Sequence, residues 1–365
     1  MADKIRLGLI GASVRGTWSA RSHLPALRAS ADVELTAVCT TRPDSAEAAR
    51  QAYGARLAFH DYNTMIASPE VDAVAVVVRV PSHYGPTKAA LDAGKHVYCE
   101  WPLGRTTAEA VELTDLAASK GLVTAIGLQA RVNPTLMYMK EVFDAGFTGE
   151  VLAVRVSLMR EGVLTRPSNR IWQRDASLGA NTLTIANGHT IDAMRYVVGD
   201  ISRLSAVVAT QAKQWLDTGT QAWVDVTAPD NILLSGWLAS GAVVSSHVSA
   251  IPYAGSGYRM EIYGRHGTLV ASGEDSPQLS DVVLHGAKPG QPLTPMPVPD
   301  RFTIATPGTP ADEALNVGQM YTLFARAIRG GEGGQPNFVT AVGLHKLVDT
   351  IKQSSDTGQT LAFSA

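Results

Sequence analysis

The sequence has little cysteine and no excess of either charge, and each shortage excludes a class of protein. Two cysteines among 365 residues, Cys39 and Cys99, cannot build a disulfide framework, and both lie in apolar, strand-like segments. We expect both to be buried, reduced thiols. The 31 Lys and Arg residues nearly balance the 33 Asp and Glu residues, which leaves a formal net charge of −2. That balance argues against nucleic acid or an anionic membrane surface as the main partner.

Several patterns that would identify a function are also missing. No apolar run reaches the roughly 18 residues that cross a bilayer, and the N-terminus lacks the apolar segment of a signal peptide. The sequence contains no His/Cys/Asp/Glu cluster with metal-ligand spacing, no Gly-x-Ser-x-Gly motif and no basic stretch of the kind that binds nucleic acid. We therefore expect a cytoplasmic protein that binds no metal, no membrane and no nucleic acid. Its length predicts about two domains.

Residues 1–130 alternate between short apolar strands and helical segments. The continuous apolar run 71–78 is typical of a parallel strand that is covered on both faces. The predicted strands are 5–10, 33–39, 71–78, 96–99 and 123–126, and the predicted helices are 18–29, 45–53, 84–93 and 107–120. Strands separated by helices at this spacing predict βαβ units. We therefore expect an α/β fold whose N-terminal domain is a Rossmann-type, doubly wound parallel sheet.

Residues 131–365 have a different pattern, and we expect them to form a second α/β domain. A helix is predicted over 182–198, and β-branched segments separated by Gly, Pro or Asn predict an antiparallel sheet. The predicted strands are 151–159, 201–210, 231–238, 242–249, 258–264 and 267–271. Residues 286–310 are rich in Pro and Gly, which predicts a segment without regular structure. Two closing helices follow, at 311–329 and 340–354, and we expect the second to pack back on the first domain.

The first predicted strand runs directly into Gly11-Ala-Ser-Val-Arg-Gly16 and then into a helix. This segment matches the Gly-x-Gly-x-x-Gly turn that cradles a dinucleotide pyrophosphate, except that Ser13 replaces the middle glycine. Gly11 permits the tight turn and Gly16 permits close packing of helix on strand, while Ser13, Val14 and Arg15 lie where the backbone would approach the phosphates. The alternative is a tight turn that binds no ligand.

The end of the second predicted strand bears on the choice of cofactor. An Asp or Glu at this point recognises the ribose 2′-hydroxyl of NAD, but the chain has Val38-Cys-Thr-Thr-Arg42. The hydroxyl of Thr40 and the guanidinium of Arg42 suit a 2′-phosphate, so we expect NADP in preference to NAD. The alternative is that Arg42 is a solvated loop residue.

Further motifs occur in a fixed order along the chain. They are Val80-Pro-Ser-His-Tyr84, Glu100-Trp-Pro-Leu103, Gln129-Ala-Arg-Val-Asn-Pro134 and Gly188-His-Thr-Ile-Asp192. In this order and spacing the chain resembles the glucose–fructose oxidoreductase/inositol dehydrogenase/rhizopine-catabolism (Gfo/Idh/MocA) family over nearly its whole length. The resemblance implies a C-terminal domain with a large open, mostly antiparallel sheet, which often forms homodimers or homotetramers. It also implies cofactor contacts by Val80, Pro81, His83, Glu100, Trp101 and Gln129.

Two positions depart from the family pattern, and both concern proton transfer. Trp101 stands where the family has a lysine, and Ile185 stands where it has an aspartate, four residues before the catalytic histidine. His189 occupies the histidine position. One branch of the family also has Glu-Trp in place of Glu-Lys. It includes the galactose-pathway repressor of yeasts, which resembles an NADP-binding dehydrogenase but acts as a sensor, and the chain resembles this branch.

The resemblance makes His189 the candidate acid/base group, and the pKa of histidine suits that role near neutral pH. The alternative is a hydrogen-bonded helix histidine. Candidates for substrate contact are Trp101, Arg131, Asn181, Trp172 and Tyr84. Asn181 precedes His189 by about two helical turns, so it could share the same helix face, but it is equally suited to cap a helix. Arg131 could bind a substrate oxygen or form an interdomain salt bridge. Trp101 could stack on a sugar or cofactor ring and Trp172 could line the pocket, or each could only pack.

Three functions remain open from the sequence. The first is an NADP-dependent oxidoreductase, with NAD possible, that acts on a carbohydrate- or polyol-like hydroxyl or carbonyl. The second is a catalytically silent NADP-binding sensor that regulates a protein partner, as the loss of the lysine and the aspartate would allow. The third is internal redox chemistry, in which a retained cofactor oxidises and then reduces the substrate during an elimination.

Overall fold

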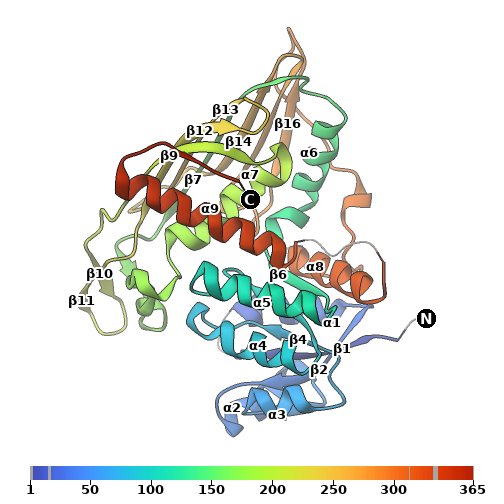
Figure 1. Ribbon diagram of the computed structural model, residues 1–365. Coiled ribbons are helices and arrows are strands. Elements are labelled where there is room, and N and C mark those ends of the chain that lie inside the picture. Colours follow the sequence, from blue (N-terminus) through green and yellow to red (C-terminus); the bar gives the residue numbers. More distant parts are fainter. Residues whose placement is uncertain (1–2, 15–17, 312, 332–335, 365) are drawn as a thin grey trace. The chain divides into compact units, whose positions relative to one another are not determined.

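The computed structural model describes residues 3–14, 18–311, 313–331 and 336–364, and it divides into two compact units (Figure 1). The first unit comprises Met1–Gln129 and Thr303–Val342, and the second comprises Ala130–Phe302 and Gly343–Ala365. The sequence predicts a second domain over residues 131–365, whereas Thr303–Val342 belongs to the first unit. Within the first unit, the Tyr321 ring packs on Tyr98 at 5.3 Å between centroids, and Phe324 packs on the same tyrosine at 6.4 Å. Such long-range packing leaves no local pattern in the sequence.

The first unit contains a six-stranded parallel sheet in the order β3-β2-β1-β4-β5-β6. Its strands are β1 (Ile5–Ile10), β2 (Val33–Cys39), β3 (Leu57–Phe59), β4 (Ala73–Val76), β5 (His96–Glu100) and β6 (Thr124–Gly127). Every residue of β4 is buried, as the continuous apolar run predicted. This order is that of the doubly wound Rossmann sheet, so the predicted fold class is confirmed for this unit.

The helices of the first unit include one that the sequence analysis missed. They are α1 (Leu24–Ala29), α2 (Pro43–Tyr53), α3 (Tyr62–Ala67), α4 (Tyr84–Asp92), α5 (Thr107–Ser119) and α8 (Glu313–Ile328). The missed helix is α3, which Asp61 caps by accepting hydrogen bonds from two main-chain N–H groups. Strand β3 was missed as well, because three half-buried residues carry too little pattern. A π-helical turn (Ser19–His23) precedes α1, and a 3₁₀ turn (Val80–Ser82) precedes α4.

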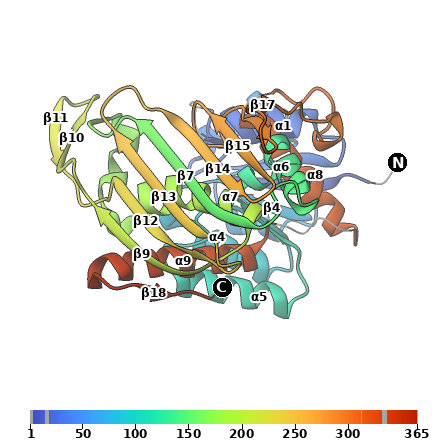
Figure 2. The ribbon, with the colours of Figure 1, turned by 90° about the horizontal axis from the view of Figure 1, so that it is seen from above.

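The second unit contains a nine-stranded sheet in the order β17-β16-β15-β14-β7-β13-β12-β9-β18, and Figure 2 shows its long strands side by side. The nine strands of this sheet are β7 (Val151–Glu161), β9 (Ile201–Ala209), β12 (Asn231–Leu238), β13 (Val243–Ile251), β14 (Gly257–Gly264), β15 (Gly267–Gly273), β16 (Val283–Ala287), β17 (Thr294–Pro295) and β18 (Leu361–Ala362). Among the described strand pairings of this nine-stranded sheet, only that of β7 with β13 is parallel. The prediction of a mostly antiparallel sheet is thus confirmed.

Side chains alternate across this sheet, and one face is covered by helices of the same unit. Helix α7 (Asn187–Val198) packs on β7 and β13, while α6 (Pro134–Asp144) packs on β15 and β16. The strand β12 alternates between buried and exposed residues along its length. The exposed face includes Val207, Leu233 and Val283, which lie in one row of the register.

The rest of the second unit holds smaller elements, several of which the sequence analysis missed. They are a three-stranded sheet of β8 (Thr165–Arg166), β10 (Gln214–Asp217) and β11 (Ala222–Asp225), a π-helical turn (Thr182–Ala186) before α7, and 3₁₀ turns at Ser168–Arg174, Ala176–Leu178 and Asp300–Phe302. The prediction that residues 286–310 lack regular structure was wrong in part, because β16, β17 and the last of these turns enter that segment. Helix α9 (Phe338–Thr357) begins in the first unit and ends in the second.

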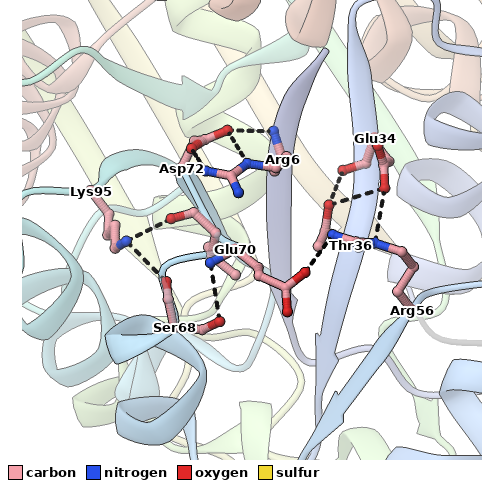
Figure 3. Close-up of polar contacts among 9 residues, drawn as sticks. Arg6, Glu34, Thr36, Arg56, Ser68, Glu70, Asp72 and Lys95 are labelled. Atoms are coloured by element: carbon pink, nitrogen blue, oxygen red, sulfur yellow. Dashed lines mark hydrogen bonds and ion pairs between the residues drawn. The ribbon is translucent and has the colours of Figure 1, made fainter. Parts of the chain in front are cut away.

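Charged side chains gather beside the amino ends of the parallel strands of the first unit (Figure 3). The guanidinium of Arg6 on β1 forms two hydrogen bonds with the carboxylate of Asp72, which precedes β4. Arg56 contacts the carboxylates of Glu34 and Glu70 at 3.4 and 2.8 Å. These side chains are between about 36% and 53% exposed, so water solvates the ion pairs. Each pair joins neighbouring segments and contributes little to the free energy of unfolding.

Candidate functional site

The turn after β1 is a place where only glycine fits. Gly11 has a φ of +93°, and a Cβ atom placed there would lie 2.1 Å from the main-chain oxygen of Val77, just beyond β4. β1 and β4 are neighbours at the point where the strand order of the sheet reverses. Ligands of open α/β sheets bind in the crevice at this point. The turn therefore has the backbone geometry expected of a dinucleotide site.

The other residues of the predicted turn are only partly described. Ser13 is half-buried. Its main-chain N–H donates to the main-chain oxygen of Gly11 at 2.8 Å, and its main-chain oxygen accepts from the Tyr53 hydroxyl at 2.7 Å. Val14 is 44% exposed, so its side chain is available to a ligand. Arg15 and Gly16 lie outside the described residues, and their predicted roles remain predictions.

The segment that follows β2 contains a carboxylate that the sequence analysis did not weigh. The guanidinium of Arg42 donates from Nε and from a terminal nitrogen to the two carboxylate oxygens of Asp44, at 3.0 and 3.1 Å. The Arg42 side chain is 63% exposed and that of Asp44 72%. Thr40 bonds the Ser45 hydroxyl at 2.7 Å. Arg42 is thus partly neutralised where a 2′-phosphate was predicted to bind.

A polar cluster lies in the first unit at the carboxyl end of β5, and it surrounds Glu100. The side-chain N–H groups of Gln129 donate to both Glu100 carboxylate oxygens, at 2.9 and 3.0 Å. The Nε2 atom of His23 lies 2.9 Å from Glu100 Oε1. Gly127 on β6 leaves room for the carboxylate, because a Cβ there would lie 2.6 Å from Glu100 Oε2. Glu100 and Gln129, both predicted cofactor residues, are therefore brought together.

His23 is the member of this cluster that sequence reasoning missed. Its ring is fully buried, and its Nδ1 atom lies 2.7 Å from the hydroxyl of Tyr321 on α8. Burial, and to a lesser degree the nearby Glu100 charge, raises the pKa of the Tyr321 phenol, so the hydroxyl keeps its proton and can donate to Nδ1. The pKa of Tyr98 is raised for the same two reasons. A lone histidine inside an apolar helical segment was the available signal, but the partner is 298 residues away.

The loop after β4 holds the next predicted cofactor residues. Val80 is buried and Pro81 half-buried in the 3₁₀ turn. His83 is buried, with its ring nitrogens 2.6 Å from the Pro102 oxygen and 3.1 Å from the Val78 oxygen. Burial lowers the pKa of His83, although both carbonyl contacts oppose this shift, so the ring serves to join two loops rather than to exchange protons.

The two remaining candidates in the first unit differ in exposure. Trp101, directly after β5, is 5% exposed. Tyr84 is half-buried at the start of α4, and its hydrogen bond to Glu112 on α5, followed by desolvation, raises the pKa of its hydroxyl. A raised pKa makes Tyr84 a weaker acid, which counts against a role in proton transfer at neutral pH.

In the second unit, His189 lies on the first turn of α7 and is 6% exposed. A π-helical turn leads into this helix, and another leads from Ser19 to His23 in the first unit. Such turns are rare and frequent at functional sites, so each candidate histidine stands beside an irregular helix start. Of the two roles predicted for Asn181, the structure shows the helix cap, and contact with a substrate stays a prediction. Asn181 precedes the helix with extended backbone and caps it, accepting from the N–H groups of Leu183 and Thr184.

Arg131 is committed to a partner in its own unit. Its guanidinium donates to both carboxylate oxygens of Asp192 on α7, at 2.8 and 2.6 Å, and lies over the Tyr196 ring. Desolvation would lower the pKa of Arg131, but the charge and hydrogen bonds of Asp192 outweigh it and raise that pKa. The predicted salt bridge exists, within one unit. Trp172 is half-buried in a 3₁₀ turn.

Comparison with known proteins identifies the class of both units. Residues 5–128 match the sequence model of an oxidoreductase family with an NAD-binding Rossmann fold, and residues 136–270 match that of a GFO/IDH/MocA C-terminal domain. The chain belongs to the GFO/IDH/MocA oxidoreductase family. The resemblance predicted from the motifs is therefore confirmed. Within the described residues no helix is long and apolar enough to cross a membrane, and no group of three metal-ligating side chains occurs.

Individual relatives include both dehydrogenases and regulators. The dehydrogenase aclE of Aspergillus oryzae is 32% identical over 56% of this chain and 58% of its own length. The galactose/lactose regulatory protein GAL80 of Saccharomyces cerevisiae is 26% identical over 66% of this chain and 60% of its own. The chain thus aligns with about three fifths of each of these relatives. A solved levoglucosan dehydrogenase, in complex with NADH and levoglucosan, superposes with a TM-score of 0.83 over both whole chains at 20% identity, which shows a shared fold.

Proposed function

We propose that the chain is an NADP(H)- or NAD(H)-dependent oxidoreductase acting on a carbohydrate- or polyol-like hydroxyl or carbonyl. The observation that carries the proposal is the Gly11 turn, a positive-φ glycine at the switch point of the parallel sheet. A Cβ there would enter the space of the Val77 oxygen, and this close approach of two chain segments fits a pyrophosphate held by main-chain N–H groups. Membership of an oxidoreductase family supports the same reading.

In the proposed reaction the hydride and the proton are handled by different groups. A bound nicotinamide accepts or supplies the hydride. In the proposal, His189 takes the proton from the substrate hydroxyl during oxidation and returns it during reduction. Its burial on α7 limits contact with bulk water. Trp101 cannot accept a proton, and Ile185 cannot either, so His189 carries this function without the two groups that usually assist it.

A sugar-like substrate is supported by one buried polar atom on α7, the helix that carries His189. The Oδ1 atom of Asn187, two residues earlier on α7, is buried and has no hydrogen-bond partner among the described residues. A buried amide oxygen of this kind is suited to accept a hydrogen bond from a substrate hydroxyl. The levoglucosan dehydrogenase complex contains a sugar derivative together with NADH. Trp101 remains the proposed stacking residue for such a ligand and Trp172 a proposed pocket residue, and Asn181, Arg131 and Tyr84 are weaker candidates.

NADP is the proposed cofactor, with NAD as the alternative. β2 ends without a carboxylate, and the exposed guanidinium of Arg42 can leave Asp44 for a 2′-phosphate. The solvated Arg42–Asp44 pair offers little resistance to this exchange because exposed ion pairs are weak.

The test follows nicotinamide absorbance while the purified protein meets a panel of sugars, polyols and glycosides with NAD(H) or NADP(H). Dinucleotide binding is recorded in the same samples by tryptophan quenching. We expect turnover with NADP(H), and a loss of about 10²–10⁴-fold in His189→Ala with cofactor affinity unchanged. His266→Ala, which removes an exposed histidine from the turn between β14 and β15 of the same unit, is the control. Full turnover in His189→Ala contradicts the acid/base role, and failure to bind either dinucleotide contradicts the proposed function.

The second candidate function is a dinucleotide-binding sensor that acts on a protein partner. The absence of Lys at 101 and Asp at 185 favours it, as does the presence of GAL80 among the relatives. A sensor binds NADP(H) tightly but turns over no compound of the panel. Binding without turnover that persists across the panel would therefore favour the sensor over the enzyme.

We also propose that the chain forms a homodimer or homotetramer through the open face of the nine-stranded sheet. Apolar side chains remain exposed on this face, namely Val207, Leu233, Trp237, Val243, Tyr263 and Val283. A shallow hollow of about 500 Å³ lies among them, lined in part by Arg155, Ser205 and His247. Exposed apolar patches of this kind mark protein interfaces. Sedimentation equilibrium tests the proposal, and a monomer at micromolar concentration would overturn it.

A further inference from the structure

The cluster around Glu100 contains more buried polar groups than a Rossmann core needs. His23, Tyr98 and Tyr321 are each fully buried, and Gln129 is 1% exposed. Buried polar groups are costly, and an apolar core of the same volume is often as stable. Glu100 is the member of the cluster with access to solvent, at 12% of its side chain. Three hydrogen bonds of the cluster, one from His23 and two from Gln129, end on the Glu100 carboxylate at the carboxyl edge of the sheet.

The direction of these hydrogen bonds follows from the chemistry of each atom. A carboxylate oxygen accepts, so His23 Nε2, at 2.9 Å, carries the proton and donates to Glu100. In the neutral ring Nδ1 then holds a lone pair and accepts from the Tyr321 hydroxyl at 2.7 Å. The Tyr321 phenol keeps its proton near neutral pH, because an ordinary tyrosine pKa is near 10 and burial raises this one further. The result is one ordered series of donors, from Tyr321 to His23 to Glu100. The same logic fixes the tautomer of a histidine beside a catalytic carboxylate.

The cluster cannot carry a proton to solvent. Tyr321 ends the series, and its side chain is fully buried against Tyr98 and His23. The arrangement therefore holds Glu100 in one orientation instead of moving its proton. His96, at the other end of β5, provides a contrast, because within the described parts of the chain its ring accepts one main-chain N–H, from Val123 at 3.0 Å, and forms no other hydrogen bond.

We propose that His23, held in one tautomer by Tyr321, is the positioning residue that fixes the Glu100 carboxylate as a hydrogen-bond acceptor for the nicotinamide end of the dinucleotide. The assignment of that ligand rests on the proposed function. β5 is two strands away from β1 on the side of the sheet beyond the switch point. Dinucleotides bind across this crevice, with one half on each side of the switch point, so the adenosine half lies on the β2 side. A fixed acceptor on the β5 side therefore serves the nicotinamide half.

The first test of the proposal reads the histidine directly. Nitrogen-15 NMR of the histidine-labelled protein reports which ring nitrogen of His23 is protonated. The expected result is a proton on Nε2 in the wild type and a mixture of tautomers in Tyr321→Phe, whose His23 has lost its donor. A proton on Nδ1 in the wild type overturns the proposal. This measurement is independent of any dinucleotide.

The second test compares binding of NADH or NADPH with that of ADP-ribose or its 2′-phosphate, which lack the nicotinamide. We expect His23→Leu to weaken dinucleotide binding about tenfold, which is the effect of one charge-assisted hydrogen bond, and ADP-ribose binding less than twofold. His23→Gln, which keeps an N–H donor near the position of Nε2, should recover most of the dinucleotide affinity. His96→Gln is the matched control and should change neither affinity.

The outcomes separate this proposal from the proposed function. Equal losses for dinucleotide and ADP-ribose in a folded His23→Leu or Tyr321→Phe protein indicate a merely structural role and overturn the proposal. Thermal melts of each variant establish that it is folded. A wild-type protein that binds no dinucleotide overturns the proposed function and the ligand assigned to Glu100, and the NMR result then decides the arrangement of His23 alone.

Discussion

Two arginine–aspartate pairs in this protein have the same geometry and different surroundings. The guanidinium of Arg6, in the first unit, donates two hydrogen bonds to Asp72, of 3.0 and 2.5 Å, and that of Arg131, in the second unit, donates two to Asp192, of 2.8 and 2.6 Å. The main-chain N–H of Arg6 also donates to Asp72, at 2.9 Å. The side chains of the first pair are 39% and 36% exposed, whereas those of the second are 18% and 1% exposed. The donor–acceptor distances therefore do not distinguish the two pairs. Their burial decides how much each contributes to the free energy of unfolding.

The difference in burial determines how costly it is to break each ion pair. A solvated pair can be broken at low cost because water replaces the lost partner. A buried pair cannot, because the remaining charge has no other partner. Asp192 lies one turn after His189 on α7, so the buried pair anchors the helix that carries the candidate acid/base residue. The solvated pair joins β1 to the start of β4, away from the Gly11 turn at the opposite end of β1.

The largest effect is expected from breaking the buried pair. Arg131→Met leaves the Asp192 carboxylate buried without a partner, and the loss of unfolding free energy should be about 3–5 kcal/mol. Urea denaturation of the folded protein measures it. The double variant Arg131→Met/Asp192→Leu removes both charges and should recover much of the loss. A single variant that is as stable as the double variant would show that burial does not control this pair.

Some parts of the fold could be predicted from the sequence and others could not. Five of the six strands of the parallel sheet and the Gly11 turn were predicted because their patterns are local, namely apolar runs and one glycine at a fixed position. Helix α6 was missed although its signals were present, since Asn133 caps it and Pro134 opens it. Short elements such as β3 have no such signals.

The candidate site was less predictable than the fold. Glu100 and Gln129 were selected from the resemblance, but their partner His23 was not, because its contact with Tyr321 joins segments 298 residues apart. Two roles were open for Asn181, a place on the His189 face of the helix and a helix cap. The structure uses it as the cap, which occupies the side-chain oxygen with main-chain N–H groups. Local patterns predict elements, whereas the partners of a polar side chain depend on tertiary packing.

An intermediate effect is expected at the half-exposed pair, and it should depend on pH. Desolvation raises the pKa of Asp72, but the hydrogen bonds and charge of Arg6 outweigh it and lower that pKa overall. Asp72 therefore stabilises the fold above its unfolded-state pKa, near 4, and the contribution is lost as pH falls through the folded-state pKa. Asp72→Asn should lose roughly a quarter or less of the stability lost in Arg131→Met at pH 7.

Urea denaturation of wild type and Asp72→Asn across a series of pH values checks this prediction. The difference between the two proteins should be constant from pH 7 to about pH 5, and should shrink as the pH falls below about 4. A difference that instead grows toward low pH would mean that Asp72 is destabilising when charged. In that case the Arg6–Asp72 pair would differ both from the buried Arg131–Asp192 pair and from a more exposed pair.

The smallest effect on stability is expected at a third pair of the same geometry, Arg42 and Asp44, whose side chains are 63% and 72% exposed. Arg42→Ala should leave the urea midpoint unchanged, because water already solvates both charges. Its effect should appear in binding instead. If Arg42 holds the 2′-phosphate, Arg42→Ala weakens NADPH about tenfold and NADH hardly at all, and Asp44→Asn strengthens NADPH by releasing the guanidinium. Equal changes for NADPH and NADH would remove Arg42 from the site, and the most exposed of the three pairs would then be a surface contact alone.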